Sequence, residues 1–159
     1  MKIEFTQIGV IHSPFTDLAQ MPIQPGGRLS APGSIDVFSE YVEGLRDLDG
    51  FSHILLLYHL HKAGKPRLLV TPFLDAKAHG VFATRAPVRP NPIGLSVVRL
   101  DHIAGSLLFV DGRDSLDGTP LLDIKPYIPS FDERADYRIG WLEGLDRNAG
   151  STLSDDRFK

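Results

Sequence analysis

The sequence predicts a mainly β protein, a small β-barrel in a single domain with one or two short helices. Short runs rich in β-branched and aromatic residues recur along the 159-residue chain. Turn residues separate them. The 15 Gly and 12 Pro make up about 17% of the 159 residues, whereas average usage of the two together is roughly 12%. With 42% hydrophobic and 23% charged residues the chain can bury one core. Short strands between regular turns favour a barrel or sandwich over a doubly wound α/β fold.

The first elements are strands separated by a long loop. Ile3–Ile11 alternates apolar and polar residues and ends before the breaker Ser13-Pro14. Residues 16–34 contain three prolines and three glycines, so we expect a loop, and a loop of that length is usually functional. Ser34–Phe38 then alternates as a half-buried strand.

A short helix and further strands follow. Glu40–Leu48 carries Tyr41, Leu45 and Leu48 at helical spacing, and Phe51–Leu60 is an apolar run typical of a strand buried on both faces. The remaining predicted strands are Arg67–Phe73, Gly80–Thr84, Leu95–Ile103 and Leu107–Val110. We therefore expect one domain over residues 1–145 and a polar C-terminal tail over 146–159.

Composition narrows the function classes. A net charge of −3 means that any nucleic-acid binding must depend on a local basic patch. The absence of Cys removes disulfides, thiolate metal sites and Cys nucleophiles. The longest apolar run, Ile54–Tyr58, is too short to span a bilayer, and the N-terminal residues lack the apolar core of a signal peptide. We expect a cytoplasmic protein. The common dinucleotide, phosphate-loop, hydrolase and zinc-protease motifs are missing.

The segment Gly80–Gly94 is the first candidate for chemistry. Its three prolines in the sequence APVRPNP fix φ and push the preceding residues into extended conformations. Such a stiff loop would hold Arg85, Arg89 and Asn91 in place, and guanidinium and amide groups suit a carboxylate, a phosphate or a purine edge. The alternative is a stiff connection that carries solvated arginines.

The second candidate is Asp111–Pro129. Asp117-Gly118 is a turn signal. In an extended chain Asp123, Lys125 and Tyr127 would project from one face and could line a pocket. They could equally form an exposed sheet face with a Lys–Asp pair worth less than about 1 kcal/mol.

Three histidines lie at even spacing in or after the apolar run. His53, His59 and His61 could share a strand face, but no acidic or His partner at a recognisable spacing completes a metal site. We expect core or pocket histidines and no bound metal.

Taken together, these segments resemble the TsaA-like (TrmO/YaeB-type) family of S-adenosylmethionine-dependent enzymes, which includes tRNA N6-methyladenosine transferases acting on position 37. The resemblance rests on six strings: Ile8–Phe15, Gly44-Leu45 with Phe51-Ser52-His53, Gly80–Arg85, Arg89–Gly94, Asp117–Pro120 and Asp123–Tyr127. It implies a small, non-Rossmann β-barrel that forms a homodimer, with the cofactor close to the subunit interface.

The resemblance also implies a site. Its cofactor-binding positions are Gln24, Pro25, Gly26, His61, Lys62, Arg85, Leu95, Asp114, Ser115, Leu116 and Asp117. An adenosyl sulfonium needs an apolar shelf, acceptors for its ribose and amino groups, and a donor for its carboxylate; Asp114 and Asp117 could accept while Arg85 donates. The candidates for the methyl acceptor, our catalytic set, are Asn91, Asp123, Lys125 and Tyr127.

The resemblance predicts in-line methyl transfer from S-adenosylmethionine to the N6 of a modified adenosine 37 in tRNA, without a metal. Only about thirty residues follow Tyr127, whereas longer members carry roughly another domain there. The alternatives are a methyltransferase of a small molecule, favoured by the short tail and acidic balance, and a non-catalytic module that binds the adenosyl ligand or RNA.

Overall fold

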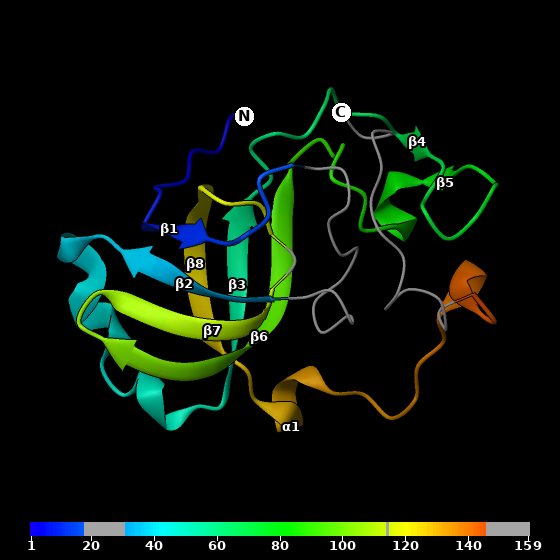
Figure 1. Ribbon diagram of the computed structural model, residues 1–159. Coiled ribbons are helices and arrows are strands. Elements are labelled where there is room, and N and C mark those ends of the chain that lie inside the picture. Colours follow the sequence, from blue (N-terminus) through cyan, green and yellow to red (C-terminus); the bar gives the residue numbers. More distant parts are fainter. Residues whose placement is uncertain (18–30, 114, 146–159) are drawn as a thin grey trace.

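Six strands of the described chain close into a barrel (Figure 1). The computed structural model describes residues 1–17, 31–113 and 115–145. The strand order around the barrel is β1 (Gly9–His12), β2 (Ala31–Val37), β7 (Leu107–Arg113), β6 (Ile93–Ala104), β3 (His53–His59) and β8 (Thr119–Pro126). All six pairings are antiparallel. The predicted mainly β fold is confirmed.

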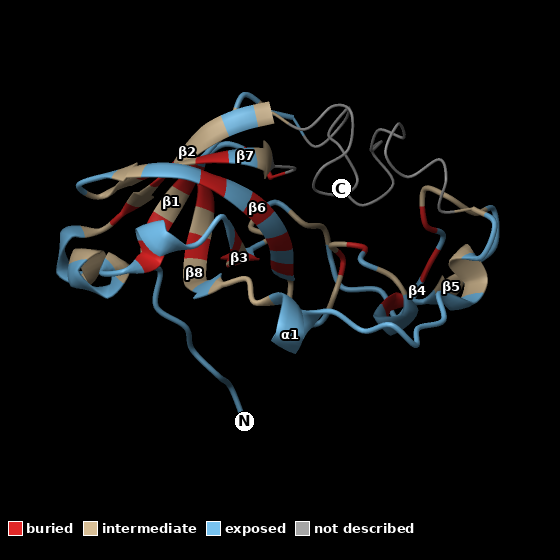
Figure 2. Ribbon diagram, turned by 90° about the horizontal axis from the view of Figure 1, so that it is seen from below, coloured by how far each residue is buried: buried red, intermediate tan, exposed pale blue. Residues whose placement is uncertain are grey.

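Alternation along the strands builds the core. In β6 the buried residues Ser96, Val98 and Leu100 alternate with exposed neighbours, as Figure 2 shows in colour. Their apolar counterparts on the other strands include Ile11, Ile35, Ile54, Leu56, Leu108 and Leu121. Closure pairs the two strands that would otherwise be sheet edges.

The strand prediction for Phe51–Leu60 was right in position and wrong in burial. Ile54, Leu56 and Tyr58 face the core, whereas Leu55 and Leu57 are only half-buried on the outer wall. A barrel wall has one face toward the core and one toward the outside, so a continuous apolar run does not imply burial on both sides.

The N-terminal strand is shorter than predicted and β2 is longer. Strand β1 begins at Gly9, the first residue in its register with β2 and β8. Strand β2 begins at Ala31, inside the predicted loop; its Pro32 lies at a register shift between Ala31 and Gly33, a position where a missing N–H is tolerated.

The predicted helix Glu40–Leu48 is two 3-10 helices, η1 (Ser39–Leu45) and η2 (Leu48–Gly50). Asp47 takes the left-handed conformation (φ 65°) between them, which stops a continuous helix. The apolar spacing was nevertheless informative, since Tyr41, Leu45 and Leu48 all pack on the barrel core.

Residues 60–92 form a side lobe next to the barrel, which Figures 1 and 2 show from two directions. The predicted strands Arg67–Phe73 and Gly80–Thr84 shrink to β4 (Leu69–Val70) and β5 (His79–Gly80), because Pro72 follows the first and a 3-10 helix, η3 (Val81–Ala83), follows the second. A second core of Val70, Val81, Ala86 and Val88, with Phe73 against it, holds the lobe.

The C-terminal segment reaches from the barrel back to this lobe. After the short helix α1 (Pro129–Asp132) comes η4 (Gly140–Leu142), whose Trp141 stacks on His79 with ring centroids 4.3 Å apart. The Trp141 Nε1–H donates to the carbonyl of Ala83 at 2.8 Å. The predicted tail 146–159 lies outside the described residues. Across the described part of the chain, no helix is long and apolar enough to cross a membrane.

Candidate functional site

One end of the barrel collects most of the expected cofactor residues. At this end, called the loop end here, β1, β3 and β7 finish and β2, β6 and β8 begin. His61 and Lys62 follow β3, the loop with Arg85 leads into β6, Leu95 is the third residue of β6, and Ser115, Leu116 and Asp117 precede β8. The antiparallel pairings bring these segments, far apart in sequence, to the same end. Gln24, Pro25, Gly26 and Asp114 lie outside the described residues.

The two arginines of the Pro-rich loop have different environments. The Arg89 Nη1 donates to the carbonyl oxygens of Thr84 at 2.8 Å and Val81 at 3.0 Å, with Ala86 more distant at 3.4 Å. Arg85 is exposed and makes no side-chain hydrogen bond or ion pair with other described residues. Arg89 therefore organises the loop, and Arg85 is left to meet a ligand.

His61 lies at the mouth of the loop end. Partial burial lowers the pKa of its imidazole from the ordinary value, and a hydrogen bond between the ring and the backbone of His59 only partly opposes this. The ring is therefore neutral at pH 7 and can accept as well as donate a hydrogen bond. A neutral ring beside Lys62 suits a polar group of an adenosyl ligand.

The turn before β8 is tied to the end of β1. The Ser13 hydroxyl donates to the carbonyl of Ser115 at 2.7 Å, and the Ser13 backbone N–H donates to Asp117 Oδ1 at 3.0 Å. That N–H and, to a smaller extent, the His12 ring hold the pKa of the Asp117 carboxyl below its ordinary value. One carboxylate oxygen of Asp117 thus accepts a hydrogen bond within the protein, and only the other is left for its expected role as an acceptor for a ligand.

Asp117→Asn should make the free energy of unfolding less dependent on pH in acid. A carboxyl whose pKa is lowered by folding stabilises the protein above its ordinary pKa and loses that contribution as pH falls through the lowered value. The side chain is 45% exposed, so we expect about 1 kcal/mol or less. Thermal unfolding near pH 7 should show a lower Tm for the variant, with a smaller gap at about pH 3. An equal gap at both pH values would contradict this role.

The outer wall of β6, β3 and β8 carries the other expected residues in rows. Cross-strand pairing aligns Leu95, Leu57 and Asp123 in one row. Val97, Leu55 and Lys125 form the next. Directly opposite side chains in neighbouring strands have Cβ atoms about 5 Å apart. Leu95 therefore connects the expected cofactor set to the expected acceptor set.

The acceptor candidates spread along this wall. Lys125 pairs with Asp123 at 2.7 Å, with side chains 58% and 44% exposed. Tyr127 lies at the far end of the barrel, where its backbone N–H donates to the carbonyl of His53 and its hydroxyl donates to Glu133 at 2.9 Å. Asn91, in contrast, is exposed at the loop end. Within one chain, then, Asp123 lies near the expected cofactor residues and Tyr127 does not.

The three histidines do not gather at one point. His53 and His59 occupy opposite ends of β3, about 20 Å apart at the usual rise per residue. Within residues 1–17, 31–113 and 115–145, no three His, Cys, Asp or Glu side chains gather as a metal site would require.

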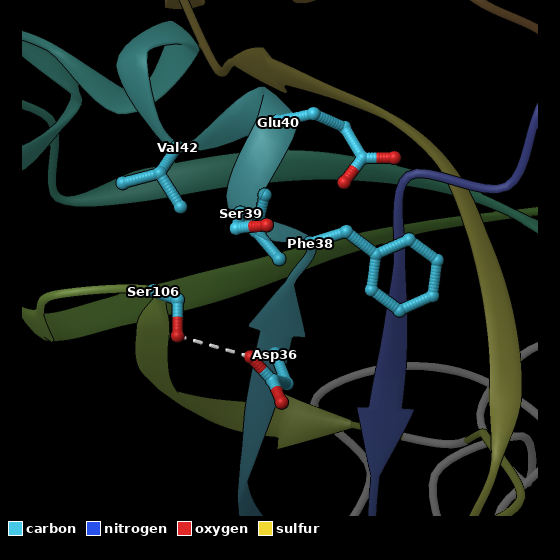
Figure 3. A pocket seen from close by; sticks show the side chains of 7 residues that line it. Asp36, Phe38, Ser39, Glu40, Val42 and Ser106 are labelled. Atoms are coloured by element: carbon cyan, nitrogen blue, oxygen red, sulfur yellow. Dashed lines mark hydrogen bonds between the residues drawn. The ribbon is translucent and has the colours of Figure 1, made fainter.

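A pocket lies at the opposite end of the barrel (Figure 3). Its volume is about 650 Å³, and its lining includes Asp36, Phe38, Glu40, Val42 and Ser106. Asp36 already accepts a hydrogen bond from the Ser106 hydroxyl at 3.1 Å. None of the expected site residues lines it, and two acidic side chains suit neither a ligand carboxylate nor an RNA phosphate.

Sequence reasoning missed two residues that shape the loop end. Ser13 bonds the turn that holds Ser115 and Asp117. Gly94 lies opposite Tyr58, whose ring occupies the space of the missing Cβ. Both stand in the strings already quoted, His-Ser-Pro and Arg-Pro-Asn-Pro-Ile-Gly, but only the register shows what they touch.

The described residues fit an adenosyl ligand in kind. The exposed, unbridged guanidinium of Arg85 suits a carboxylate, and Leu95, 50% exposed, offers an apolar surface. The fit lies in the type of donor and in the apolar character of the surface.

The sequence profile described as "tRNA-methyltransferase O N-terminal domain" matches residues 10–133. The chain belongs to this family. It is a family of S-adenosylmethionine-dependent methyltransferases, so the predicted resemblance is confirmed.

Individual relatives agree with the family. A probable S-adenosyl-L-methionine-binding protein of Pyrococcus abyssi is 51% identical over 99% of this chain and 86% of its own length. The tRNA (adenine(37)-N6)-methyltransferase of Escherichia coli is 38% identical over 88% of this chain and 64% of its own. The crystal structure of TrmO from Pseudomonas aeruginosa superposes with a TM-score of 0.73 at 40% identity, over 88% of this chain and 62% of that one. The chain thus spans less than two thirds of these two methyltransferases.

Proposed function

We propose that this chain binds S-adenosylmethionine and transfers its methyl group to the N6 of a modified adenosine 37 in tRNA. The observation that carries the proposal is the 38% identity, over 150 residues, to the E. coli enzyme named for that reaction. The aligned region covers 88% of this chain, more than the whole barrel. A tRNA substrate would place the protein in the cytoplasm.

When bound, the cofactor supplies an activated methyl group and its own leaving group, so the protein's task is binding and alignment. Arg85 would bind the carboxylate, and Leu95 would cover an apolar face. His61 and Lys62, beside them, would contact the polar groups. Gln24, Pro25, Gly26, Asp114, Ser115, Leu116 and Asp117 complete the proposed cofactor set.

Asp123 and Asn91 would hold the acceptor. The carboxylate of Asp123 can accept a hydrogen bond from an exocyclic amine, which orients the nitrogen lone pair. The Lys125 ammonium, 2.7 Å from an oxygen of this carboxylate, holds it in position. Tyr127, at the far end of the wall, could act only from a different subunit.

The outer wall supports a homodimer. Ile93, Leu95 and Val97 are 37%, 50% and 36% exposed, and Leu55 and Leu57 extend the same apolar face. A contiguous apolar patch rimmed by Arg99, His53 and Asp123 is typical of a protein interface. A second copy on this wall would bring its own residues to the candidate site. Light scattering should give twice the chain mass; a monomer at micromolar concentration contradicts this part of the proposal.

The direct test is methylation of tRNA from a strain that lacks the gene. Purified protein and S-adenosylmethionine should convert the modified adenosine, seen by nucleoside mass spectrometry as a gain of one methyl group. Unchanged tRNA, with cofactor binding intact in calorimetry, would overturn the tRNA assignment and favour a small-molecule acceptor.

A second candidate is binding without transfer. It is favoured by the archaeal relatives, three of which are 45–51% identical and named only as probable S-adenosyl-L-methionine-binding proteins. Calorimetry separates it from the enzyme: a pure sensor binds the cofactor but yields no demethylated product with any acceptor.

Two substitutions should distinguish the cofactor-binding residues from the residues that hold the methyl acceptor. Arg85→Ala removes the charged donor for the carboxylate and should weaken cofactor binding about 10- to 100-fold. Lys125→Ala leaves Asp123 unsupported and should lower kcat while the cofactor Kd stays within about twofold. Calorimetry and single-turnover kinetics measure the two effects; equal losses of cofactor affinity would show that this division of the site is wrong.

A further inference from the structure

Charge is distributed very unevenly along the chain. Residues 60–92, the side lobe, contain six Lys or Arg and one Asp, whereas the rest contains eleven Lys or Arg and nineteen Asp or Glu. The single lobe acid, Asp75, accepts a hydrogen bond from His79 at 2.8 Å. The lobe is thus a basic module with a net charge of +5 in a chain whose net charge is −3.

Two segments of the lobe bring its positive charges together. Segments 60–68 and 84–92 run side by side between the barrel and β4–β5 (Figure 1). They are joined by the Leu60 N–H to the Pro92 carbonyl at 2.8 Å and by the Arg67 N–H to the Val88 carbonyl at 2.9 Å. The two segments, called the basic strip here, hold Lys62, Lys65, Arg67, Arg85 and Arg89 and no Asp or Glu.

Three of these charges are available to a partner. Elsewhere Lys2, Arg46 and Lys125 each pair with a carboxylate. In the strip, Lys62, Lys65 and Arg85 are exposed and form no ion pair with any residue that the structure describes. Like charges held close together without counter-charges repel one another, and an anionic partner relieves that cost.

An aromatic side chain stands beside the strip. Phe82 is 75% exposed, and the Arg89 guanidinium lies 5.8 Å from its ring centroid. Unpaired bases stack on exposed aromatic rings, and adjacent cations bind the phosphates between them. A double helix cannot use such a ring, because its bases are already stacked. The combination therefore fits a single-stranded loop of RNA.

We propose that the basic strip and Phe82 form the RNA-docking surface, in which Lys65 and Arg67 bind phosphates and Phe82 stacks on an unpaired base. The inference rests on the proposed tRNA substrate. It adds that the RNA docks on the lobe, next to Arg85 and Lys62 of the cofactor set. A net charge of −3 is then no obstacle, because the acidic residues lie outside residues 60–92 apart from Asp75.

The test is the salt dependence of RNA affinity. The probe is a fluorescent anticodon stem-loop RNA, titrated with the full chain between about 50 and 300 mM KCl. For a variant with both Lys65→Gln and Arg67→Gln, we expect roughly 10- to 100-fold weaker binding at about 0.1 M salt and a log–log slope smaller by about 1.5 to 2. Phe82→Leu should weaken binding about 5- to 100-fold and leave the slope unchanged.

Arg46→Gln is the matched control. It removes one exposed charge after η1, on the side of the barrel away from the lobe (Figures 1 and 2). Its RNA affinity should match the wild type. All variants should keep the wild-type cofactor affinity, since Lys65, Arg67 and Phe82 do not belong to the proposed cofactor set.

The outcomes separate the two proposals. If the wild type methylates tRNA while the double variant keeps its affinity and slope, the docking surface is wrong and the proposed function stands. If the wild type neither binds nor methylates tRNA at low salt, both proposals fail. Weaker binding with a reduced slope only in the strip variant, alongside wild-type methylation, supports both.

Discussion

Gly94→Ala should lower the free energy of unfolding by about 3 kcal/mol, because an alanine Cβ would overlap the ring of Tyr58. Tyr58 lies directly opposite in β3 and is only 5% exposed. Its hydroxyl is hydrogen-bonded to the buried Ser96 at 2.8 Å, so the ring cannot move aside without breaking that contact. Chemical denaturation of wild type and variant measures the difference, with an unchanged m-value expected.

Gly80 provides the comparison. A Cβ at Gly80 has no heavy atom within 4 Å, and its φ of −60° suits any residue, so Gly80→Ala should be neutral within about 0.5 kcal/mol. If both alanine variants were equally stable, steric overlap with Tyr58 would not explain why glycine is needed at position 94.

Hydrophobic alternation located β1, β2 and β6, because each of these strands had to present one face to the core, whereas β8 (Thr119–Pro126) was not among the predicted strands. The clearest case is Leu95–Ile103, which lies within β6 (Ile93–Ala104). The lengths of the lobe strands were overestimated, since β4 and β5 have two residues each. Most of the second core comes from residues outside these two strands. Which residues pair is a long-range property, so the start of β1 and the bulge at Pro32 could not be obtained from local pattern.

The candidate site, like the fold, could be predicted from the sequence only in part. Pro-rich spacing correctly indicated a loop with two guanidiniums, but only the contacts distinguish Arg85 from Arg89. The even spacing of Asp123, Lys125 and Tyr127 implied one face. The structure shows an exposed Asp123–Lys125 pair, which was the alternative considered for this segment, and a Tyr127 that is bound to Glu133. Whether these side chains line a pocket or an exposed sheet face depends on the residues that they contact, and such residues can be distant in sequence.

Arg89→Met should disorder the loop before β6 and reduce stability by about 3–4 kcal/mol. The Nη1 group makes two short bonds, to Thr84 and Val81, and hydrogen bonds from charged donors contribute about 1.5–3 kcal/mol each. Methionine keeps much of the apolar stem and removes every donor. The carbonyls of this turn would then lose their shared partner, and Arg85, between Thr84 and Ala86, would lose its fixed direction.

The disorder caused by Arg89→Met should weaken cofactor binding as well as lower the Tm. Because Arg89 does not belong to the proposed cofactor set, a merely structural role predicts lower stability with normal cofactor affinity once the protein is folded. A positioning role predicts that folded Arg89→Met, at low temperature, also binds S-adenosylmethionine about tenfold more weakly, and that Arg89→Met causes no further loss when Arg85→Ala is already present. Arg89→Lys should behave like Arg89→Met, since an ammonium group on a shorter side chain cannot reproduce the guanidinium geometry that reaches both carbonyls. Additive losses in the double variant would show that Arg89 stabilises the lobe without positioning Arg85.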